Sequence, residues 1–326
     1  MIKVGILGLG AYLPAKKLTN FDLEKIVDTS DEWIRTRTGI RERRIAALHE
    51  KTSDLAAKAA IEALQDAKIS AERIDLIIVA TISPDSSFPS VACKVQKIIG
   101  AKKASAFDVS AACSGYLVAL TTAKQFIQTG LYKRVLVIAA DRITSLIDWK
   151  DRDTCVLFGD GAGACVLGPT KSGGIIADFI QAFGDQGELM QVIAEEARSP
   201  YHPERTNHTK LPYISMQGQE LFKMAVNSMA DAIVKALKKA KIKKSDVDCI
   251  VPHQANDRII SAVAKKLNIP KEKIFINIDK YGNMSAASIA VALYEAKKSK
   301  RIKKGDNVVL VTFGAGLISA ANVVKW

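Results

Sequence analysis

The sequence predicts an α/β protein whose two halves repeat the same order of elements. The expected strands are short and almost continuously apolar, which is typical of a mainly parallel sheet covered by helices on both faces. These runs are LIIVAT (76–81), VLVIAA (135–140) and NVVLVTF (307–313). The 326 residues are 48% hydrophobic, which is enough for a large buried core, and the length suggests about two domains.

The repeat is visible when the halves are compared segment by segment. A helix exit followed by an apolar strand occurs twice, as ISAERIDLIIVAT (69–81) and as IKKSDVDCIVPHQ (242–254). Small residues, a helical run, a basic connection and a strand then follow in both halves, over 112–141 and 282–316. This matching order indicates duplication. We expect a first half over 1–173 and a second over 174–326, divided within GPTKSGG (168–174).

One segment does not fit the repeat. Residues 185–215 interrupt the second half with Pro, Asn, His and Thr, so we expect an insertion near the functional face. Its two histidines, His202 and His208, are interpreted as exposed loop residues.

Composition limits the possible partners. The formal net charge of +13 favours anionic molecules such as acidic proteins, phosphorylated cofactors or nucleic acids, although Lys-rich helices are also ordinary solvated surfaces. Nucleic acid is the weakest of these options, because aromatic residues make up only 6% and no recognition module is present. No apolar stretch approaches the roughly 20 residues of a membrane helix. We therefore expect a soluble, cytoplasmic protein with no membrane partner.

The cysteines are scattered and odd in number. Their spacing fits neither a disulfide framework nor a metal site, so each is either an inert buried thiol or a catalytic one. They are Cys93, Cys113, Cys155, Cys165 and Cys249. Most are expected to be inert.

Cys113 is the candidate nucleophile. It follows the strand-like run ASAFDVS (104–110) and precedes the helical run GYLVALTTAKQF (115–126), which places its sulfur near a helix N-terminus. That position is expected to lower the pKa of the thiol, and the small neighbouring residues leave room for an acyl group. Tight packing around a buried cysteine would explain the same pattern, and the spacing does not decide between the two.

Two further polar residues are expected at the same edge of the fold. His253 directly follows the strand DCIV (248–251), at the carboxyl end where α/β proteins bind ligands. Asn283 occupies in the second half the place that Cys113 has in the first, at a turn before a helix. Alone, His253 would be interpreted as structural and Asn283 as a turn residue beside Gly282. Together with Cys113 they predict a site.

Glycine-rich segments next to apolar strands give a second clue. FGDGAGA (158–164) and FGAGLIS (313–319) do not open a helix as a dinucleotide-binding motif does, and neither does GILGLG (5–10). Such glycines instead allow backbone N–H groups to approach a substrate carbonyl.

Three motifs together resemble those of β-ketoacyl-acyl carrier protein synthase III, the initiating condensing enzyme of type II fatty acid synthesis. They are ACSGY with Cys113, HQANDR with His253 and YGNMSAAS with Asn283. The resemblance spans nearly the whole chain in the family's order. It also includes SDEWIRTRTGIRERR (30–44), FPSVACKVQ (88–96), DRDTCVLFGDGAGA (151–164) and FGAG near the end.

The resemblance implies the thiolase fold, a five-layered α-β-α-β-α pair of similar halves, and a homodimer. It implies a Cys-His-Asn triad and no permanently bound cofactor, with a coenzyme A thioester as substrate. In the implied reaction Cys113 takes the acyl group of an acyl-CoA, usually acetyl-CoA. Malonyl-acyl carrier protein then loses carbon dioxide, and His253 with Asn283 stabilises the enolate that attacks the acyl-cysteine. The product is a 3-oxoacyl-acyl carrier protein, and the backbone N–H groups of Cys113 and Ala315 form the oxyanion hole.

Binding roles are implied by the same motifs. Trp33 and Arg152 would stack on the adenine of coenzyme A, with Arg37 and Thr38 in the matching segment. Phe88 would reach across the dimer to close the partner's acyl tunnel. The acidic carrier protein would dock on the loop after the second-half strand and on the next helix, through Gln254, Ala255, Asn256, Asp257 and Arg258 together with Lys265 and Lys266.

Two departures from the family pattern bear on these roles. Ile318-Ser319 stands where members often have Thr-Trp, which affects the shape of the acyl pocket. Asp257 places an acid in the docking segment, where it either weakens docking or pairs with Arg258.

The sequence also bears on four rival functions. A degradative thiolase would carry a second cysteine in FGAGLIS, and a chain-elongating synthase would have a histidine at the position of Asn283. A related synthase of a secondary metabolite remains open and would differ in its choice of nucleophile. A catalytically silent binding protein also remains open, and it would form no covalent acyl adduct.

Overall fold

The first half of the chain forms a five-stranded sheet in the order β1-β7-β6-β4-β5. The computed structural model describes residues 2–193 and 213–326. β4 runs parallel to both of its neighbours, β5 and β6, whereas β7 runs antiparallel to β6 and β1. The strands are β1 (Val4–Tyr12), β4 (Leu76–Ala80), β5 (Ser105–Val109), β6 (Val135–Arg142) and β7 (Asp160–Pro169).

The second half repeats this topology. Its sheet has the order β11-β12-β13-β8, with β11 and β12 parallel and the other pairs antiparallel. An isolated bridge between Ile250 and Ile274 lies beyond β11, where β5 lies beyond β4 in the first sheet. The strands are β8 (Gly174–Ala182), β11 (Cys249–Pro252), β12 (Asn307–Gly314) and β13 (Ile318–Lys325).

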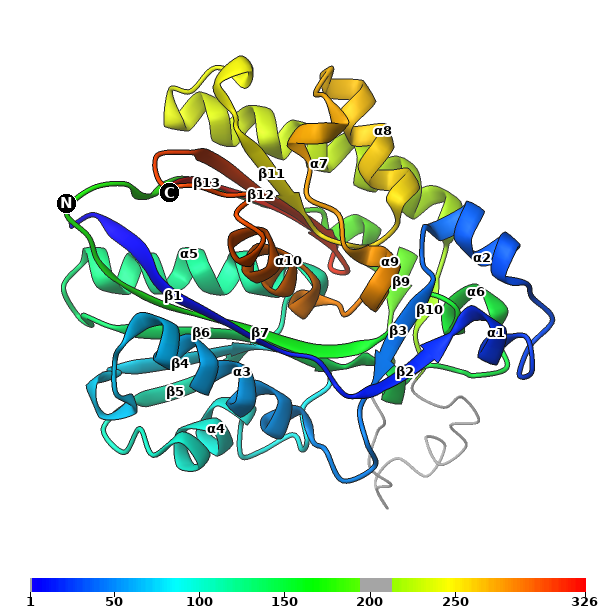
Figure 1. Ribbon diagram of the computed structural model, residues 1–326, viewed down its shortest axis with the longest axis horizontal. Coiled ribbons are helices and arrows are strands. Elements are labelled where there is room, and N and C mark those ends of the chain that lie inside the picture. The colour runs from blue at the N-terminus through cyan, green and yellow to red at the C-terminus, as the bar shows by residue number, and fades with distance from the viewer. Residues whose placement is uncertain (1, 194–212) are drawn as a thin grey trace.

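Helices separate and cover the two sheets, giving five layers (Figure 1). α3 (Thr52–Ala67) and α4 (Val91–Ile99) pack on the outer face of the first sheet. α7 (Gly218–Ala240) and α8 (Asp257–Leu267) cover the second sheet on its outer side. Between the sheets lie α5 (Gly115–Gln128) and α10 (Ala286–Lys298). The predicted five-layered α/β fold is confirmed.

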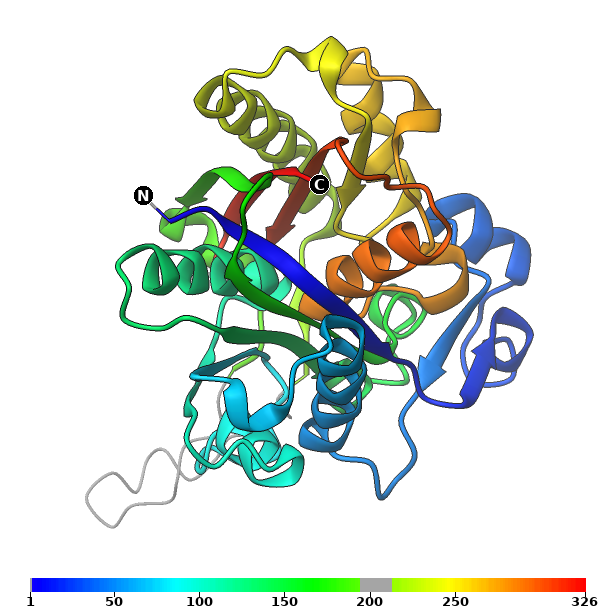
Figure 2. The ribbon, with the colours of Figure 1, turned by 60° about the vertical axis from the view of Figure 1, so that its left-hand side comes forward.

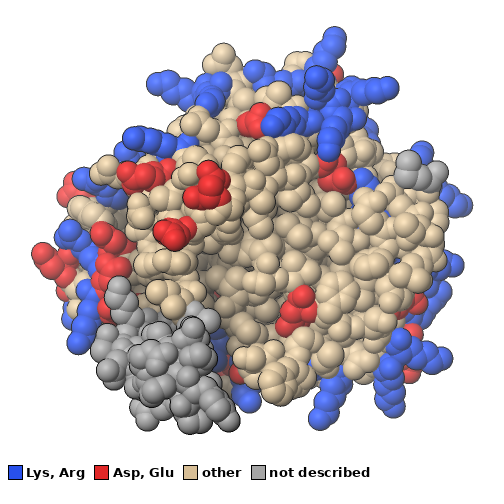
Figure 3. Space-filling model, turned by 180° about the vertical axis from the view of Figure 1, so that it is seen from behind, with Lys and Arg blue, Asp and Glu red and all other residues tan. Residues whose placement is uncertain are grey.

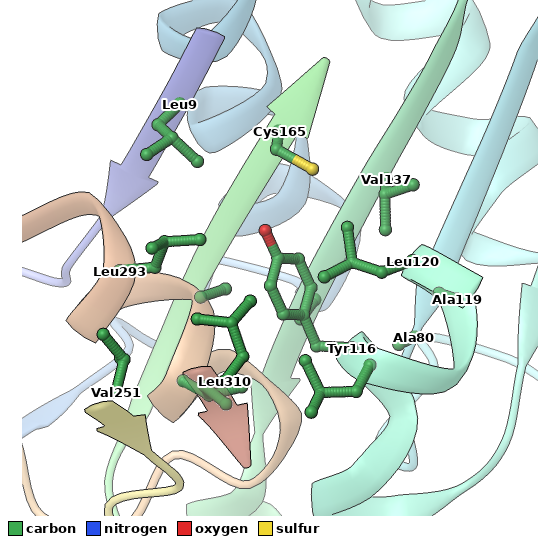
Figure 4. Packing of buried hydrophobic residues seen from close by; sticks show 14 of the residues in the cluster. Leu9, Ala80, Tyr116, Ala119, Leu120, Val137, Cys165, Val251, Leu293 and Leu310 are labelled. Atoms are coloured by element: carbon green, nitrogen blue, oxygen red, sulfur yellow. The ribbon is translucent and has the colours of Figure 1, made fainter. Parts of the chain in front are cut away.

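The central layer is built from small and aliphatic side chains that let both sheets approach. Gly163 of β7 lies so close to α10 that an added Cβ would stand 2.5 Å from the Cβ of Ala290. Figure 4 shows Tyr116 of α5 pointing across this core, with its hydroxyl toward Cys165 of β7. Tyr116 and Cys165 are both completely buried.

The link between the halves requires glycine. β7 ends at Pro169 and β8 begins at Gly174, and the division that we propose between 173 and 174 falls in this connection. Gly173 and Gly174 have φ values of 70° and 102°, which residues with a side chain rarely adopt. A Cβ at Gly174 would also stand 2.2 Å from the backbone oxygen of Val4.

Shorter elements lie outside the two duplicated sheets. A two-stranded ribbon of β2 and β3 extends beyond β1, and β9 pairs with β10 on either side of residues 194–212. None of the described helices is both long and apolar enough to cross a membrane. The shorter elements outside the two sheets are β2 (Lys16–Thr19), α1 (Asn20–Leu23), α2 (Asp31–Thr38), β3 (Glu42–Ile45), α6 (Arg152–Cys155), β9 (Met190–Gln191), β10 (Ser215–Met216) and α9 (Ile278–Tyr281).

Candidate active site

Cys113 lies in a single 3-10 turn (Ala112–Ser114) that leads directly into α5. The second half holds this turn in place. Thr312 Oγ1 donates a hydrogen bond of 3.0 Å to the carbonyl oxygen of Cys113, and Ser114 Oγ donates one of 2.8 Å to the carbonyl oxygen of Ile318. Gly314 approaches so closely that a Cβ there would stand 2.9 Å from the Cys113 nitrogen. Contacts with the second half of the chain therefore fix the position of the turn that carries the thiol.

Two cavities meet at Cys113. A cavity of about 660 Å³ and a smaller one of about 160 Å³ share only Cys113, Phe158 and Met190 among their lining residues. Apolar side chains dominate the lining of both cavities, and the smaller one also contains His253 and Asn283. A group held at the sulfur is thus accessible from two directions.

His253 follows β11 and is only 2% exposed. Its backbone N–H donates to the carbonyl oxygen of Val311 at 2.8 Å, which anchors it beside β12. Burial lowers the pKa of the imidazole to about 3, so His253 is neutral at physiological pH. Its buried Nδ1 makes no hydrogen bond to any residue that the structure describes.

Asn283 lies at the turn before α10, which is the counterpart of the position of Cys113 before α5. Its backbone bonds to the segment before β7, since its N–H donates to Leu157 and its carbonyl accepts from Gly159. Asn283 Oδ1 accepts from the Ser285 N–H at 2.9 Å. This bond leaves the Nδ2 donor of Asn283 available to the smaller cavity.

The expected lowering of the Cys113 pKa is wrong for this structure. Cys113 is 5% exposed, and burial raises the pKa of its thiol to about 12. A nearby carboxylate, Asp141, also raises it, while the hydroxyl of Ser285 acts in the opposite direction. Desolvation disfavours the charged thiolate, and the short turn before α5 does not compensate for it.

Trp33, Arg37 and Arg152 come together on the surface, although Arg152 is far from the other two in sequence. The guanidinium carbon of Arg152 lies 5.0 Å from the ring centroid of Trp33, and that of Arg37 lies 5.7 Å away. Thr38 does not join them. Its side chain is buried and donates to the Ile34 carbonyl at 2.6 Å, so it closes α2 instead of facing a ligand.

The loop after His253 divides into a buried and an exposed part. Gln254 is 1% exposed, and its Oε1 accepts from the N–H groups of Asn277 and Ile278. The expected docking contact from Gln254 is therefore wrong, because the side chain is occupied inside the protein. Ala255 and Asn256 instead line the smaller cavity.

Asn256 connects this loop to α2. Its Oδ1 accepts from the Arg258 N–H and begins α8, while its Nδ2 donates to the carbonyl oxygen of Arg37 at 3.1 Å. Figures 1 and 2 show α2 beside α8. Asp257 forms its ion pair with Lys271, at 3.8 Å, instead of with Arg258. Arg258 lies over the ring of Phe222 at 5.9 Å.

The insertion contributes to the site, as its position in the sequence suggested. Met190, Gln191, Val192 and Ile214 line the larger cavity. His202 and His208 fall outside the described residues. Reasoning from the sequence missed Phe158 and Met190, which separate the two cavities, because a single apolar residue in an irregular segment gives no periodic signal.

The duplicated halves and the thiol between two cavities define a condensing enzyme of the thiolase fold. Comparisons with known proteins narrow this class. The family models of 3-oxoacyl-[acyl-carrier-protein (ACP)] synthase III match residues 107–184 and, for its C-terminal part, residues 237–326. The chain belongs to this family.

The similarity to individual relatives extends over the whole length of this chain. The chain is 53% identical over 326 residues to the beta-ketoacyl-[acyl-carrier-protein] synthase III of Caldanaerobacter subterraneus, covering 100% of this chain and 98% of that protein. The relative from Clostridioides difficile is 54% identical over 99% of this chain and 98% of its own. The crystal structure of 3-oxoacyl-[acyl-carrier-protein] synthase III from Aquifex aeolicus aligns with a TM-score of 0.92 and 50% identity, covering 99% of this chain and 100% of that one. The protein is therefore an initiating condensing enzyme of fatty acid synthesis.

Proposed function

We propose that Cys113 takes the acyl group of a coenzyme A thioester, with acetyl-CoA as the primer, and passes it to malonyl-acyl carrier protein. The junction of the two cavities at Cys113 carries this proposal. The thioester arm would occupy the smaller cavity, and the acyl chain would extend into the larger one. Sulfur attack forms an acyl-cysteine while the C–S bond to coenzyme A breaks and the free thiol leaves.

In the second step the malonyl group enters through the smaller cavity and loses carbon dioxide. The electrons of the broken C–C bond form an enolate, which attacks the acyl-cysteine. The thiolate of Cys113 is released and takes up a proton. His253 and the Nδ2 of Asn283 would donate hydrogen bonds to the enolate oxygen in a site with little water. We assign the imidazole proton to Nε2, because the buried Nδ1 has no acceptor among the described residues.

An acyl oxyanion also needs donors during both steps. We assign this role to the backbone N–H groups of Cys113 and Ala315. Ala315 belongs to the loop between β12 and β13 that approaches the Cys113 turn, and it lines the larger cavity beside the thiol. The neighbouring Ile318 faces the same cavity, so this departure from the family pattern shapes the acyl pocket.

We propose that Trp33, Arg37 and Arg152 hold the adenine of coenzyme A at the rim of the smaller cavity. A guanidinium over an aromatic ring is a surface on which a purine stacks. Asn256 connects this cluster to the cavity wall through the Arg37 carbonyl.

Arg152→Ala is expected to raise the KM for acyl-CoA about tenfold, the equivalent of about 1.4 kcal/mol of stacking, with little change in kcat. The matched control is Arg35→Ala, which removes a cation from the same region but one that pairs with Asp31. Steady-state kinetics with varied acyl-CoA measures the difference. An unchanged KM in Arg152→Ala would remove the adenine assignment.

The carrier protein is proposed to dock beside the mouth of the smaller cavity, on Ala255, Asn256 and Arg258, with Lys265 and Lys266 farther along α8. Basic side chains there complement an acidic partner. The ion pair of Asp257 with Lys271 turns the acid away from Arg258, so it neutralises less of this surface than a pair with Arg258 would.

Arg258→Glu is expected to raise the KM for malonyl-acyl carrier protein by about tenfold or more at low salt, and to leave the KM for acyl-CoA near its wild-type value. Lys303→Glu is the control, because Lys303 precedes β12 and so lies toward the opposite end of that strand from Gly314 and the active site. Kinetics at two ionic strengths test the assignment. Equal effects on both substrates would contradict docking at Arg258.

We also propose a cytoplasmic homodimer, since coenzyme A thioesters are cytoplasmic substrates. The outer edge of β5 has no partner strand among the described residues, and an open edge favours pairing with a second copy. Phe88 is 86% exposed, which suits a residue that reaches into the partner. Figure 3 shows that the face turned away from the viewer in Figure 1 carries few charges over its centre.

Intact-protein mass spectrometry tests the proposed function. Incubation with acetyl-CoA should add one acetyl group, peptide mapping should place it on Cys113, and malonyl-acyl carrier protein should remove it with release of the 3-oxoacyl product. Discharge by malonyl-CoA instead would favour the synthase of a secondary metabolite. A complete lack of adduct with acetyl-CoA and longer acyl-CoAs would favour a silent binding protein.

A further inference from the structure

Two buried polar atoms near Cys113 have no hydrogen-bond partner among the described residues, and the mechanism above uses neither. They are the Oγ atom of Ser285 and the Oδ2 atom of Asp141. The two residues are 1% and 0% exposed. A buried polar atom without a hydrogen-bond partner destabilises the fold, so its presence near a reactive thiol suggests a task.

Asp141 is clamped through one oxygen only. It lies at the end of β6, and its Oδ1 accepts three hydrogen bonds, from Thr81 Oγ1 at 3.0 Å, the Ile82 N–H at 2.9 Å and Ser83 Oγ at 2.9 Å. These bonds fix the carboxyl group and leave Oδ2 free. Burial raises the pKa of Asp141, which makes its carboxylate a better proton acceptor than an exposed one.

Ser285 is held in a strained backbone conformation. Its φ of 51° lies in the left-handed region, and the bond from its N–H to Asn283 Oδ1 helps to hold it there. Its side chain lines the larger cavity with Cys113. The Ser285 hydroxyl acts to lower the pKa of both the Cys113 thiol and the Asp141 carboxyl, and it forms no hydrogen bond to any described residue in this structure.

We propose that Ser285 and Asp141 form a proton relay for the acylation step. The Cys113 thiol gives its proton to Ser285 Oγ as the sulfur attacks the thioester, and Ser285 passes its own proton to Asp141 Oδ2. When the C–S bond to coenzyme A breaks, the proton returns through Ser285 to the departing thiolate. In this relay Ser285 exchanges a proton directly with the reacting sulfur, and Asp141 is a positioning residue that acts through Ser285. This inference rests on the proposed acylation of Cys113.

The other titratable group at the thiol does not fit this task. His253 lines the smaller cavity with Cys113, but burial lowers its pKa to about 3 and makes it a weak base. The charge of Asp141, by contrast, acts on the thiol and raises the pKa of Cys113 further than burial alone. A thiol that burial keeps protonated needs an acceptor within reach at the moment of attack.

Two variants with opposite effects on the free thiol test the relay. Without substrate, Asp141→Asn should lower the apparent pKa at which iodoacetamide alkylates Cys113, because the repelling carboxylate is gone. Ser285→Ala should raise that pKa. Both variants should nevertheless slow single-turnover acylation by acetyl-CoA about a hundredfold. Damage to the fold alone would not move the alkylation pKa in two directions while slowing both acylations.

Ser288→Ala is the matched control, since Ser288 is a buried serine three residues farther along, in the first turn of α10, and its hydroxyl accepts from the Met284 N–H at 2.7 Å. It should alter neither measurement. Acylation of Cys113 in the wild-type protein is measured in parallel, and it separates the relay from the proposed function. Its absence would contradict the proposed function itself. Wild-type acylation with an unchanged rate in either variant, or an unchanged alkylation pKa in Asp141→Asn, would overturn the relay.

Discussion

Cys113→Ala is expected to abolish acyl transfer, with a loss in kcat of about 10⁴ or more. The backbone donors at the 3-10 turn and both cavities would remain, but no atom could hold the acyl group between the two half-reactions. The fold should survive, because the side chain is small and the turn is held by Thr312 and Ser114 through backbone carbonyls. The change therefore separates chemistry from structure.

Cys93→Ala provides the control. Cys93 is the exposed cysteine, and it lies on α4, away from both cavities. Its removal should leave turnover intact. Thermal unfolding and mass spectrometry after exposure to acetyl-CoA should show, for Cys113→Ala, a melting temperature within a few degrees of wild type and no acyl increment. An acyl group on the Cys113→Ala protein would place the nucleophile elsewhere.

The relative placement of Cys113, His253 and Asn283 could be anticipated because each follows an apolar strand or precedes a helix. Repeated strands of a duplicated fold end at corresponding edges, so residues 140 positions or more apart in sequence are expected near one another. The same logic predicted two similar α/β halves, whereas the five layers were implied by the resemblance to the synthase III family. That logic could not predict the burial of Gln254 or Thr38, since adjacent residues of one loop or helix end face opposite ways and only packing decides which.

The pKa of the Cys113 thiol shows a second limit of the sequence. A position before a helix suggested a lowered pKa, but the outcome depends on how tightly distant segments enclose the sulfur. Gly314 and Asp141 come from different strands, β12 and β6, and nothing in the local motif ACSGY specifies their distance from Cys113. Packing between distant segments therefore determines the pKa of the Cys113 thiol, which the local spacing of residues could not predict.

His253→Ala is expected to leave formation of the acyl-enzyme intact and to slow the condensation that follows it. Acylation by acetyl-CoA should stay near the wild-type rate, because His253 is not the acceptor for the thiol proton in the mechanism proposed here. Decarboxylative condensation should fall by about 10² to 10³, the cost of removing one donor to a developing oxyanion. Asn283→Ala should show the same loss in condensation. It also removes the bond to the Ser285 N–H, so His253→Ala is the cleaner variant.

The pH dependence of the second half-reaction gives an independent test of the neutral imidazole. A folded-state pKa of about 3 means that His253 gains its proton far below the ordinary value near 6.5, so acidification from pH 8 to pH 5 leaves it neutral. Condensation by pre-acylated wild-type enzyme, followed by quenched-flow release of carbon dioxide from malonyl-acyl carrier protein, should show no inflection near pH 6.5. An inflection there that disappears in His253→Ala would mean that the imidazole titrates in solution and acts as a base, which would replace the donor role argued from its burial.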